Sequence, residues 1–273
     1  MTSQWERLLK NTGRWQGSFT QISPTGSLLA DIPSVVALTP LDDGNLMRQI
    51  IVKQSGDTPD ETVLEYRSLA KSVLFLENGA FSQGSIQWGP FSEFGAELGL
   101  IADNERLRLV QRFDKSRALH SLTLMREHLA GTTPVARSQT TVADLLGTWV
   151  GTATTTYPDL RPDDTYPTRL EVAQQGDRVE QTLQLGSHGS QMQSREVVGD
   201  RRILFTGGSQ AVQVLLLPGG ASSTCPIAIE PRQPIILEVG WLLSPHRRQR
   251  LIRQYNAQGT WSSLTLVDES KVV

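Results

Sequence analysis

The chain has 273 residues, of which 38% are hydrophobic and 20% are charged, a balance typical of a folded protein rather than a disordered one. Its formal net charge of −2 supplies no positive field, so we expect no binding to nucleic acid or to an anionic membrane surface. The opening residues, MTSQWERLLKNTG, lack the apolar core of a signal peptide, and no apolar run long enough to span a membrane follows. We therefore expect a soluble, cytoplasmic protein that is not an integral membrane protein.

Two short segments resemble helices, residues 5–11 (WERLLKN) and 142–147 (VADLLG). Each is a turn or two long and leads into a Gly-x-Trp motif. Most of the remaining chain has a hydrophobic period of two, as in LMRQIIVKQ (46–54) and TRLEVAQ (168–174). Asp-Gly, Asn-Gly, Gly-Gly or Gly-Asp dipeptides punctuate these segments, and we expect a hairpin at 43–45. The pattern predicts antiparallel strands joined by hairpins.

The second half of the chain repeats the first. Residues 108–127 (RLVQRFDKSRALHSLTLMRE) align without a gap with 250–269 (RLIRQYNAQGTWSSLTLVDE), at an offset of 142 (250 minus 108). The two Gly-x-Trp-x-Gly motifs match at an offset of 134, and AELGL (96–100) matches LEVGW (237–241) at 141. Because all the matches occur in the same order, we predict a tandem duplication.

A linker separates the two copies. Residues 130–141 (AGTTPVARSQTT) are polar and have no apolar periodicity. We expect a first barrel over 1–131, a linker over 132–139 and a second barrel over 140–273. A meander of hairpins closes most simply into an up-and-down barrel, so the predicted fold class is all-β, with two tandem antiparallel barrels. The interior of a barrel of about eight strands is either filled by side chains or holds one small ligand.

A short helix, then Gly-x-Trp in the first strand, then antiparallel strands of which a late one carries arginine, is the pattern of the lipocalin and fatty-acid-binding group, the calycins. The matching residues are Gly13, Trp15, Gly147 and Trp149, with Arg108, Arg112 and Arg117 late in the first copy and Arg250 and Arg253 late in the second. The resemblance implies two lipocalin-like barrels. Trp15 and Trp149 would then close each barrel floor by stacking a ring against a late-strand arginine.

Two longer motifs, residues 147–172 and 77–101, resemble an uncharacterised cyanobacterial family described as a domain of unknown function. Its members resemble tandem lipocalin-like barrels, so the resemblance implies a fold and a source and supplies no activity. A more distant similarity of architecture joins the chain to the bilin lyases of phycobiliproteins. No catalytic motif of those lyases can be matched here residue by residue, so this link is an analogy of fold alone.

The richest aromatic stretch, residues 81–91, has no close counterpart in the second copy. Phe81, Gln83, Trp88 and Phe91 are candidate ligand-binding residues, because aromatic rings interleaved with amides suit a pocket for a planar ligand. The competing interpretation, that Trp88 and Phe91 are ordinary packing residues, is slightly favoured by base frequencies. We expect the first barrel to be the ligand-binding one.

Arginines supply three further candidates, Arg48, Arg108 and Arg112. If the apolar side of the strand near residue 108 faces the barrel interior, its arginines form a solvated outer face, and this is the favoured interpretation. If they point inward instead, Arg108 and Arg112 could bind a carboxylate such as a fatty acid head or a tetrapyrrole propionate. The repeated pairs Arg108/Glu127 and Arg250/Glu269 could simply be ion pairs across neighbouring strands.

No residue pattern identifies a catalytic or metal site. Cys225 is the only cysteine, which excludes an internal disulfide and favours a small buried residue over a nucleophile. The four histidines, His120, His128, His188 and His246, lack metal-binding spacing. We expect no metal and no cofactor apart from a possible bound bilin or lipid.

Three functions remain open. The leading one is the binding or carriage of a hydrophobic or planar small molecule, such as a lipid, a bilin or other tetrapyrrole, or a carotenoid, in a barrel cavity. The second is an enzyme, a bilin lyase or isomerase that acts on phycobiliproteins. The third is a non-catalytic assembly scaffold with filled barrels and a protein client, which predicts an apolar surface outside the barrels.

Overall fold

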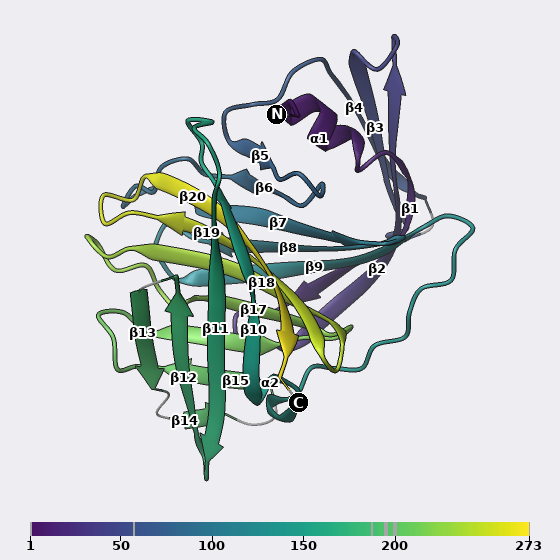
Figure 1. Ribbon diagram of the computed structural model, residues 1–273. Coiled ribbons are helices and arrows are strands. Elements are labelled where there is room, and N and C mark those ends of the chain that lie inside the picture. The colour runs from purple at the N-terminus through teal and green to yellow at the C-terminus, as the bar shows by residue number, and fades with distance from the viewer. Residues whose placement is uncertain (1, 57, 187, 194–195, 199–200, 273) are drawn as a thin grey trace.

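The computed structural model describes residues 2–56, 58–186, 188–193, 196–198 and 201–272, and the side chains of 187–200 fall outside that description. It contains two antiparallel sheets that follow each other in the chain, each curled into a barrel (Figure 1). The prediction of an all-β fold with two tandem barrels is therefore confirmed. Both short helices predicted from the sequence are present as well, as α1 (Gln4–Leu9) and α2 (Val142–Leu145).

The first sheet has nine strands, in the order β4-β3-β2-β1-β9-β8-β7-β6-β5. These strands are β1 (Gly13–Ile22), β2 (Leu28–Leu41), β3 (Leu46–Lys53), β4 (Asp60–Tyr66), β5 (Val73–Phe75), β6 (Phe81–Gly84), β7 (Phe94–Ala102), β8 (Glu105–Phe113) and β9 (Leu119–Leu129). The expected hairpin at 43–45 joins β2 to β3. The repeated segment seen in the sequence is the β8–β9 hairpin, whose last strand pairs with β1.

The second sheet has eleven strands, in the order β13-β12-β11-β10-β20-β19-β18-β17-β16-β15-β14. These strands are β10 (Gly147–Thr156), β11 (Asp164–Gln175), β12 (Arg178–Leu185), β13 (His188–Gln193), β14 (Glu196–Val198), β15 (Arg202–Phe205), β16 (Val212–Leu216), β17 (Ala221–Pro226), β18 (Ile235–Ser244), β19 (Arg247–Tyr255) and β20 (Trp261–Lys271). As in the first sheet, the last strand, β20, pairs with the first, β10. The duplication is thus a duplication of topology.

Each helix is fixed at both ends. Ser3 and Glu6 form a capping box at the start of α1, and Thr141 and Asp144 form the equivalent box at α2. After each helix the chain turns into the first strand at a glycine with positive φ, +130° at Gly13 and +111° at Gly147, a conformation that other residues rarely adopt. These glycines explain why Gly-x-Trp marks the start of both sheets.

Helix α1 covers the open side of the first barrel. The outer strands β4 and β5 are not paired with each other in the described sheet, and α1 lies between them (Figure 1). Trp5 and Leu8 of α1 pack in the same apolar cluster as Trp15. The Gln4 amide also accepts a bond from the Phe75 N–H and donates one to the Phe75 carbonyl, as a neighbouring strand would do. The helix therefore fills the opening and satisfies part of the β5 edge.

The two barrels share their largest apolar core. It includes Leu98, Leu107, Leu109, Phe113 and Leu124 from the first barrel and Leu215, Val239, Leu251, Tyr255 and Trp261 from the second. These side chains come from β7–β9 of the first barrel and from β16 and β18–β20 of the second, and strands β7 and β8 pack against β17–β19 (Figure 1). Sheets packed in this way bury their facing side chains as a sandwich does. The barrels are consequently one packed body.

Hydrogen bonds also cross between the barrels. The Gln111 amide donates to the Ser223 hydroxyl at 2.7 Å. The Trp88 N–H donates to the Gly259 carbonyl at 2.8 Å, and the Trp261 N–H donates to the Ile86 carbonyl at 2.9 Å. The barrels are therefore linked by backbone bonds as well as by apolar packing.

The connection between the barrels, residues 130–141, contains neither helix nor strand but is held in place. Arg137 donates two hydrogen bonds to the Glu105 carboxylate, at 3.0 and 2.8 Å, and its guanidinium lies 5.2 Å from the centre of the Trp241 ring. Thr140 donates its backbone N–H to the Leu217 carbonyl. The segment is thus bonded to both barrels.

Because the main core belongs to both barrels, we predict that they unfold together. Calorimetry should give one transition with equal calorimetric and van't Hoff enthalpies. Leu237→Ala, in the shared core, should lower the free energy of unfolding by about 2–5 kcal/mol and leave one transition. Two resolved transitions, or a Leu237→Ala variant in which only one barrel melts early, would contradict a shared core.

Candidate functional site

A buried cluster of two arginines and two glutamates occupies the interior of the first barrel. Glu127 accepts hydrogen bonds from Arg106 Nε at 2.7 Å and from Arg108 Nε and Nη2 at 2.9 and 2.8 Å. Arg108 Nη1 also donates to Glu97 at 2.7 Å. The side chains of Arg106 and Glu127 are 2% and 1% exposed, so the charges are neutralised within the cluster rather than by water.

The second barrel contains the same cluster at the equivalent positions. Glu269 accepts from Arg248 Nε at 2.7 Å and from Arg250 Nε at 2.9 Å. Arg250 Nη1 lies 3.4 Å from Glu238. The pairs Arg108/Glu127 and Arg250/Glu269 are therefore ion pairs, one of the interpretations that the sequence left open.

Each buried tryptophan lies under one of these arginines. The Arg106 guanidinium is 4.5 Å from the centre of the Trp15 ring, and that of Arg248 is 4.4 Å from Trp149. The stacking of tryptophan on a late-strand arginine is present, but Arg106 and Arg248 are not the arginines that the resemblance supplied. Arg106 and Arg248 are 142 residues apart (248 minus 106), which is the offset of the repeat. An alignment of the two copies could therefore have identified them.

The expectation that the arginines of β8 form a solvated outer face is wrong. Arg106 and Arg108 point into the barrel, and the alternating apolar residues Leu107 and Leu109 point outward. The physical reason is that the second barrel covers the outer face of β8, so an apolar outer face is not exposed to water. The alternation of residues along the sequence identified the two faces of β8. It could not show which of these faces the second barrel would cover.

Arg253 and Arg117, which also belong to the calycin-like pattern seen in the sequence, lie in different surroundings. Arg253 is fully buried on the outer face of β19, where it donates to Ser82 Oγ at 3.1 Å and to the Ser85 carbonyl at 2.9 Å, so it joins the barrels. Arg117 lies in the turn between β8 and β9, and its carbonyl accepts from the Ile229 N–H. Neither side chain belongs to a barrel interior cluster.

The charge pairing keeps the cluster ionised. Burial alone would raise the pKa of Glu127, but Arg108 and Arg106 outweigh it and lower the pKa from 4.5 to about 2. The same balance of burial against Arg250 and Arg248 lowers the pKa of Glu269. Carboxylates of this kind are poor general acids near neutral pH, and both arginines already have acceptors. The clusters are therefore structural ion pairs rather than a vacant carboxylate site.

Two of the candidate ligand residues, Gln83 and Arg112, line one hollow of about 440 Å³ on the inner face of β6–β8. Gln83 donates to Glu97 at 2.7 Å, and Arg112 lies 3.1 Å from Glu93, so both already have protein partners. Arg108 is joined to this hollow only through Glu97. The structure brings these residues near one another but satisfies them internally.

The other candidates lie apart. Phe81 is buried in the barrel core, with its ring centre 5.2 Å from that of Phe75. Trp88 packs on the core shared by the barrels, and Phe91 is 85% exposed. Arg48 projects from β3 to pair with Glu65 of β4 at 2.6 Å, and both side chains are exposed. The seven candidates do not form one site.

The largest hollow described lies between the barrels. This inter-barrel cleft has a volume of about 810 Å³. Its apolar lining residues are Trp5, Leu69, Ala70, Val73, Leu74 and Ile86 from the first barrel and Pro158, Leu160 and Trp261 from the second, and its polar ones are Gln4, Arg67, Ser68, Lys71, Gln87, Asp159 and Thr260. Its walls come from loops far apart in the chain, so no local sequence pattern could have revealed it.

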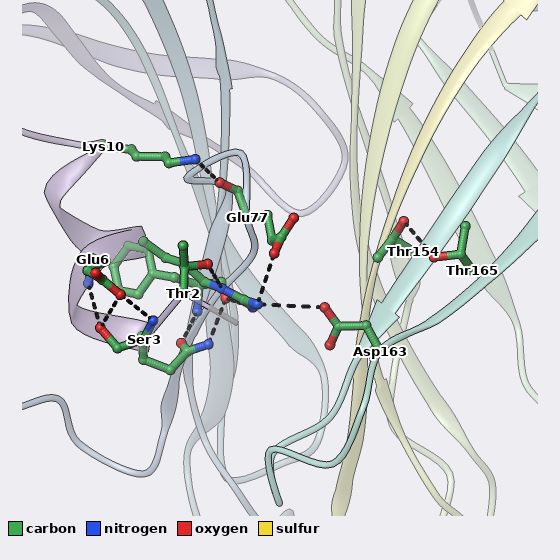
Figure 2. Close-up of polar contacts among 11 residues, drawn as sticks. Thr2, Ser3, Glu6, Lys10, Glu77, Thr154, Asp163 and Thr165 are labelled. Atoms are coloured by element: carbon green, nitrogen blue, oxygen red, sulfur yellow. Dashed lines mark hydrogen bonds and ion pairs between the residues drawn. The ribbon is translucent and has the colours of Figure 1, made fainter.

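An ion pair spans the two barrels near this cleft. Figure 2 shows Asp163, which lies just before β11, reaching toward α1. Arg7 Nη2 lies 3.8 Å from Asp163 and 3.7 Å from Glu77, while Arg7 Nη1 donates to the Phe75 carbonyl at 3.1 Å. Arg7 is buried, and its contacts hold α1 against β5 and the β10–β11 loop.

Other groups that could carry chemistry are few. Burial raises the pKa of the Cys225 thiol to about 12, which leaves it uncharged and unreactive near neutral pH. Within the described residues, no group of three or more His, Cys, Asp or Glu side chains is arranged to hold a metal. The side chain of His188 lies outside the described residues.

Comparison with known proteins gives two family matches. Residues 1–132 match the N-terminal part of a domain of unknown function, DUF3598, and residues 136–272 match the C-terminal domain of biogenesis factor required for ATP synthase 1. A crystal structure of a DUF3598 protein from the cyanobacterium Nostoc punctiforme, described as of unknown function, is 46% identical, covers 100% of both chains and superimposes with a TM-score of 0.94. The chain belongs to the DUF3598 family. The resemblance of residues 147–172 and 77–101 to a cyanobacterial family of unknown function is thereby confirmed.

A second solved structure is much less similar. A mutant of transferrin binding protein B from Haemophilus parasuis is 9% identical, with a TM-score of 0.27 over 96% of this chain and 59% of that one. No curated protein matches. None of the described helices is both long and apolar enough to cross a membrane.

The cluster of the first barrel yields a stability prediction. Glu127→Gln should reduce the free energy of unfolding by about 3–5 kcal/mol, because it leaves Arg106 and Arg108 buried without their shared carboxylate. Urea denaturation measures the loss. The matched control, Glu65→Gln, removes the exposed partner of Arg48 and should change stability by less than about 1 kcal/mol. Equal effects of the two substitutions would contradict a buried cluster.

The pKa of Glu127 predicts how this loss depends on pH. Since folding lowers the pKa from 4.5 to about 2, the stabilisation is complete above pH 4.5 and is lost as the pH falls toward about 2. The difference in stability between the wild type and Glu127→Gln should therefore be constant near neutral pH and shrink below pH 4.5. Urea denaturation at a series of pH values tests this, and a difference unchanged by acid would contradict it.

Proposed function

We propose that the protein is a non-catalytic assembly factor that binds a protein client. The observation that carries this proposal is the match of residues 136–272 to the C-terminal domain of biogenesis factor required for ATP synthase 1. The match covers the whole second sheet and both strands of its repeated hairpin. The expected client class is a subunit of ATP synthase.

The state of the barrel interiors supports this proposal. In the first barrel, α1 and the cluster around Glu127 take up part of the interior, and the equivalent cluster around Glu269 lies inside the second. Interiors that hold paired protein side chains favour the scaffold hypothesis, in which function lies on the outer surface. A client would then meet exposed strands and loops rather than enter a barrel.

Strand β4 offers a suitable outer surface. It ends the first sheet and is exposed along most of its length. Val63 and Leu64 are 50% and 45% exposed, which is unusual for apolar residues in the middle of a strand. An edge strand with free backbone groups and apolar side chains can accept a strand from another protein. We propose that a strand of the client pairs with β4 at the edge of the first sheet.

This function predicts complexes with purified ATP synthase subunits. Native mass spectrometry of the full chain, mixed in turn with each subunit from Nostoc punctiforme, should detect a complex with at least one of them. Val63→Lys together with Leu64→Lys should weaken it about tenfold or more, because lysines on an edge strand oppose strand addition. The control is Val150→Lys, on the exposed side of β10, a strand paired on both sides.

Two outcomes would overturn the proposal. If no subunit forms a complex, the assembly function fails. If a complex forms and the two β4 lysines leave it as tight as the control does, the client is bound but not at β4.

Small-molecule carriage is the second candidate, and the inter-barrel cleft favours it. Its volume of about 810 Å³ lies within the range of about 300–1,000 Å³ usual for small-molecule sites. The ligand classes considered from the sequence, a lipid, a bilin or other tetrapyrrole, or a carotenoid, would occupy this cleft rather than a barrel interior. The bilin lyase hypothesis lacks an observation that favours it over carriage.

A further inference from the structure

Leu160 forms one wall of the inter-barrel cleft in a strained backbone conformation. Its φ is +59°, a region that bulky side chains rarely adopt, and it is 60% exposed. A chain under selection only for stability would be expected to have glycine or asparagine here. The strain and the exposed apolar surface fall on the same residue, at the rim of the largest hollow described.

The loop that carries Leu160 is held by contacts among its own residues. The Leu160 N–H donates to the Tyr157 carbonyl at 2.9 Å, and the Tyr157 hydroxyl donates to Asp164 at 2.5 Å. The Arg161 guanidinium lies 3.5 Å from the centre of the Tyr157 ring. The leucine is therefore held toward the cleft by its own loop before any ligand arrives.

The part of the lining around Ile86, from the first barrel, is also apolar and is bonded to the second barrel. Ile86 is 51% exposed, and its carbonyl accepts the N–H of Trp261 at 2.9 Å, which joins the barrels at the base of the cleft. Gln87 donates to the Gln258 carbonyl at 2.8 Å and accepts from the Thr260 hydroxyl at 2.8 Å. These bonds fix the lining around Ile86 to the second barrel, so a ligand need not order this part of the cleft.

The charges at the rim favour an acidic ligand. Asp159 is paired with Arg161, and Arg67 is paired with Asp42 in a contact whose side chains are 60% and 58% exposed. Lys71 has no ion-pair partner in the part of the chain that the structure describes. The charge left over in the cleft is thus positive, and Arg67 can add to it because an exposed pair is weakly held.

We propose that the inter-barrel cleft binds a small apolar molecule that carries a carboxylate, with its apolar part between Leu160 and Ile86 and its carboxylate at Lys71. This assignment rests on small-molecule carriage, the second candidate function, and specifies the ligand class and its orientation. It differs from a barrel-interior site, because residues of both barrels form the walls.

Two fluorescent probes that differ only in charge test the proposal, cis-parinaric acid and its methyl ester. Energy transfer from the tryptophans, of which Trp5 and Trp261 line the cleft, to the polyene reports binding, and the variants below locate it. The wild-type full chain should bind both and prefer the acid. Lys71→Gln should weaken binding of the acid about three- to fivefold, the effect of one exposed ion pair, and leave the ester unchanged. Lys115→Gln, in the exposed β8–β9 turn, is the matched control.

A second variant examines the apolar wall. Leu160→Gly should weaken binding of both probes to a similar extent, while the melting temperature stays equal or rises, since glycine accepts the positive φ. The melting temperature thereby distinguishes weaker binding caused by unfolding from weaker binding caused by loss of the Leu160 side chain.

The possible results distinguish a failure of the ligand assignment from a failure of small-molecule carriage itself. If neither probe binds, small-molecule carriage at the cleft and the inference both fail. If both probes bind with equal affinity, and Lys71→Gln affects neither, carriage stands and the assignment of an acidic ligand is overturned. If Leu160→Gly leaves both affinities intact, the ligand lies elsewhere and the assignment of the wall is wrong.

Discussion

Leu107, Leu109 and Phe113 point away from the interior of the first barrel and are buried only because the second barrel covers them. This contact determines the rest of the arrangement. Once the apolar side of β8 faces the partner barrel, strand alternation forces Arg106 and Arg108 inward. Two buried guanidinium groups require buried carboxylates, which Glu127 and Glu97 supply. The barrels are thus more polar at their centres, along these strands, than where they touch.

Duplication explains why the same solution occurs twice. Each barrel needs an apolar outer face for the other, so each acquires an interior arginine pair and a glutamate to match. The two copies have diverged in the loops at the edges of their contact. The β10–β11 loop of the second copy carries Leu160 at the cleft, whereas the β1–β2 connection of the first copy contacts the second barrel through the Pro24 carbonyl, which accepts from Gln213. The function is accordingly sought where the copies differ, at loops and edges.

The sequence predicted the strands, the two short helices and the tandem barrels, because hydrophobic period, turn residues and the repeat offset are local signals. It could not decide which side of β8 faces inward, because a strand with arginines on one face and leucines on the other fits either arrangement until its neighbour is known. The cleft was also hidden, since Trp5, Ile86 and Leu160 have no common sequence pattern. Of the candidate ligand residues, Gln83 and Arg112 lie in one hollow, and Phe81, Trp88, Phe91 and Arg48 are dispersed.

The shared face also sets a condition on how the chain is made. The first barrel is complete once β9 has been synthesised, but its partner face on β17–β19 lies in the last third of the chain. At about 5–20 residues per second, synthesis of the second barrel takes from several seconds to about half a minute. During that interval the leucines of β8 lack the partner face that buries them in the complete chain. A nascent chain of this protein therefore exposes an apolar surface before synthesis is complete. A chaperone that covers the nascent chain until β20 emerges would act at this face.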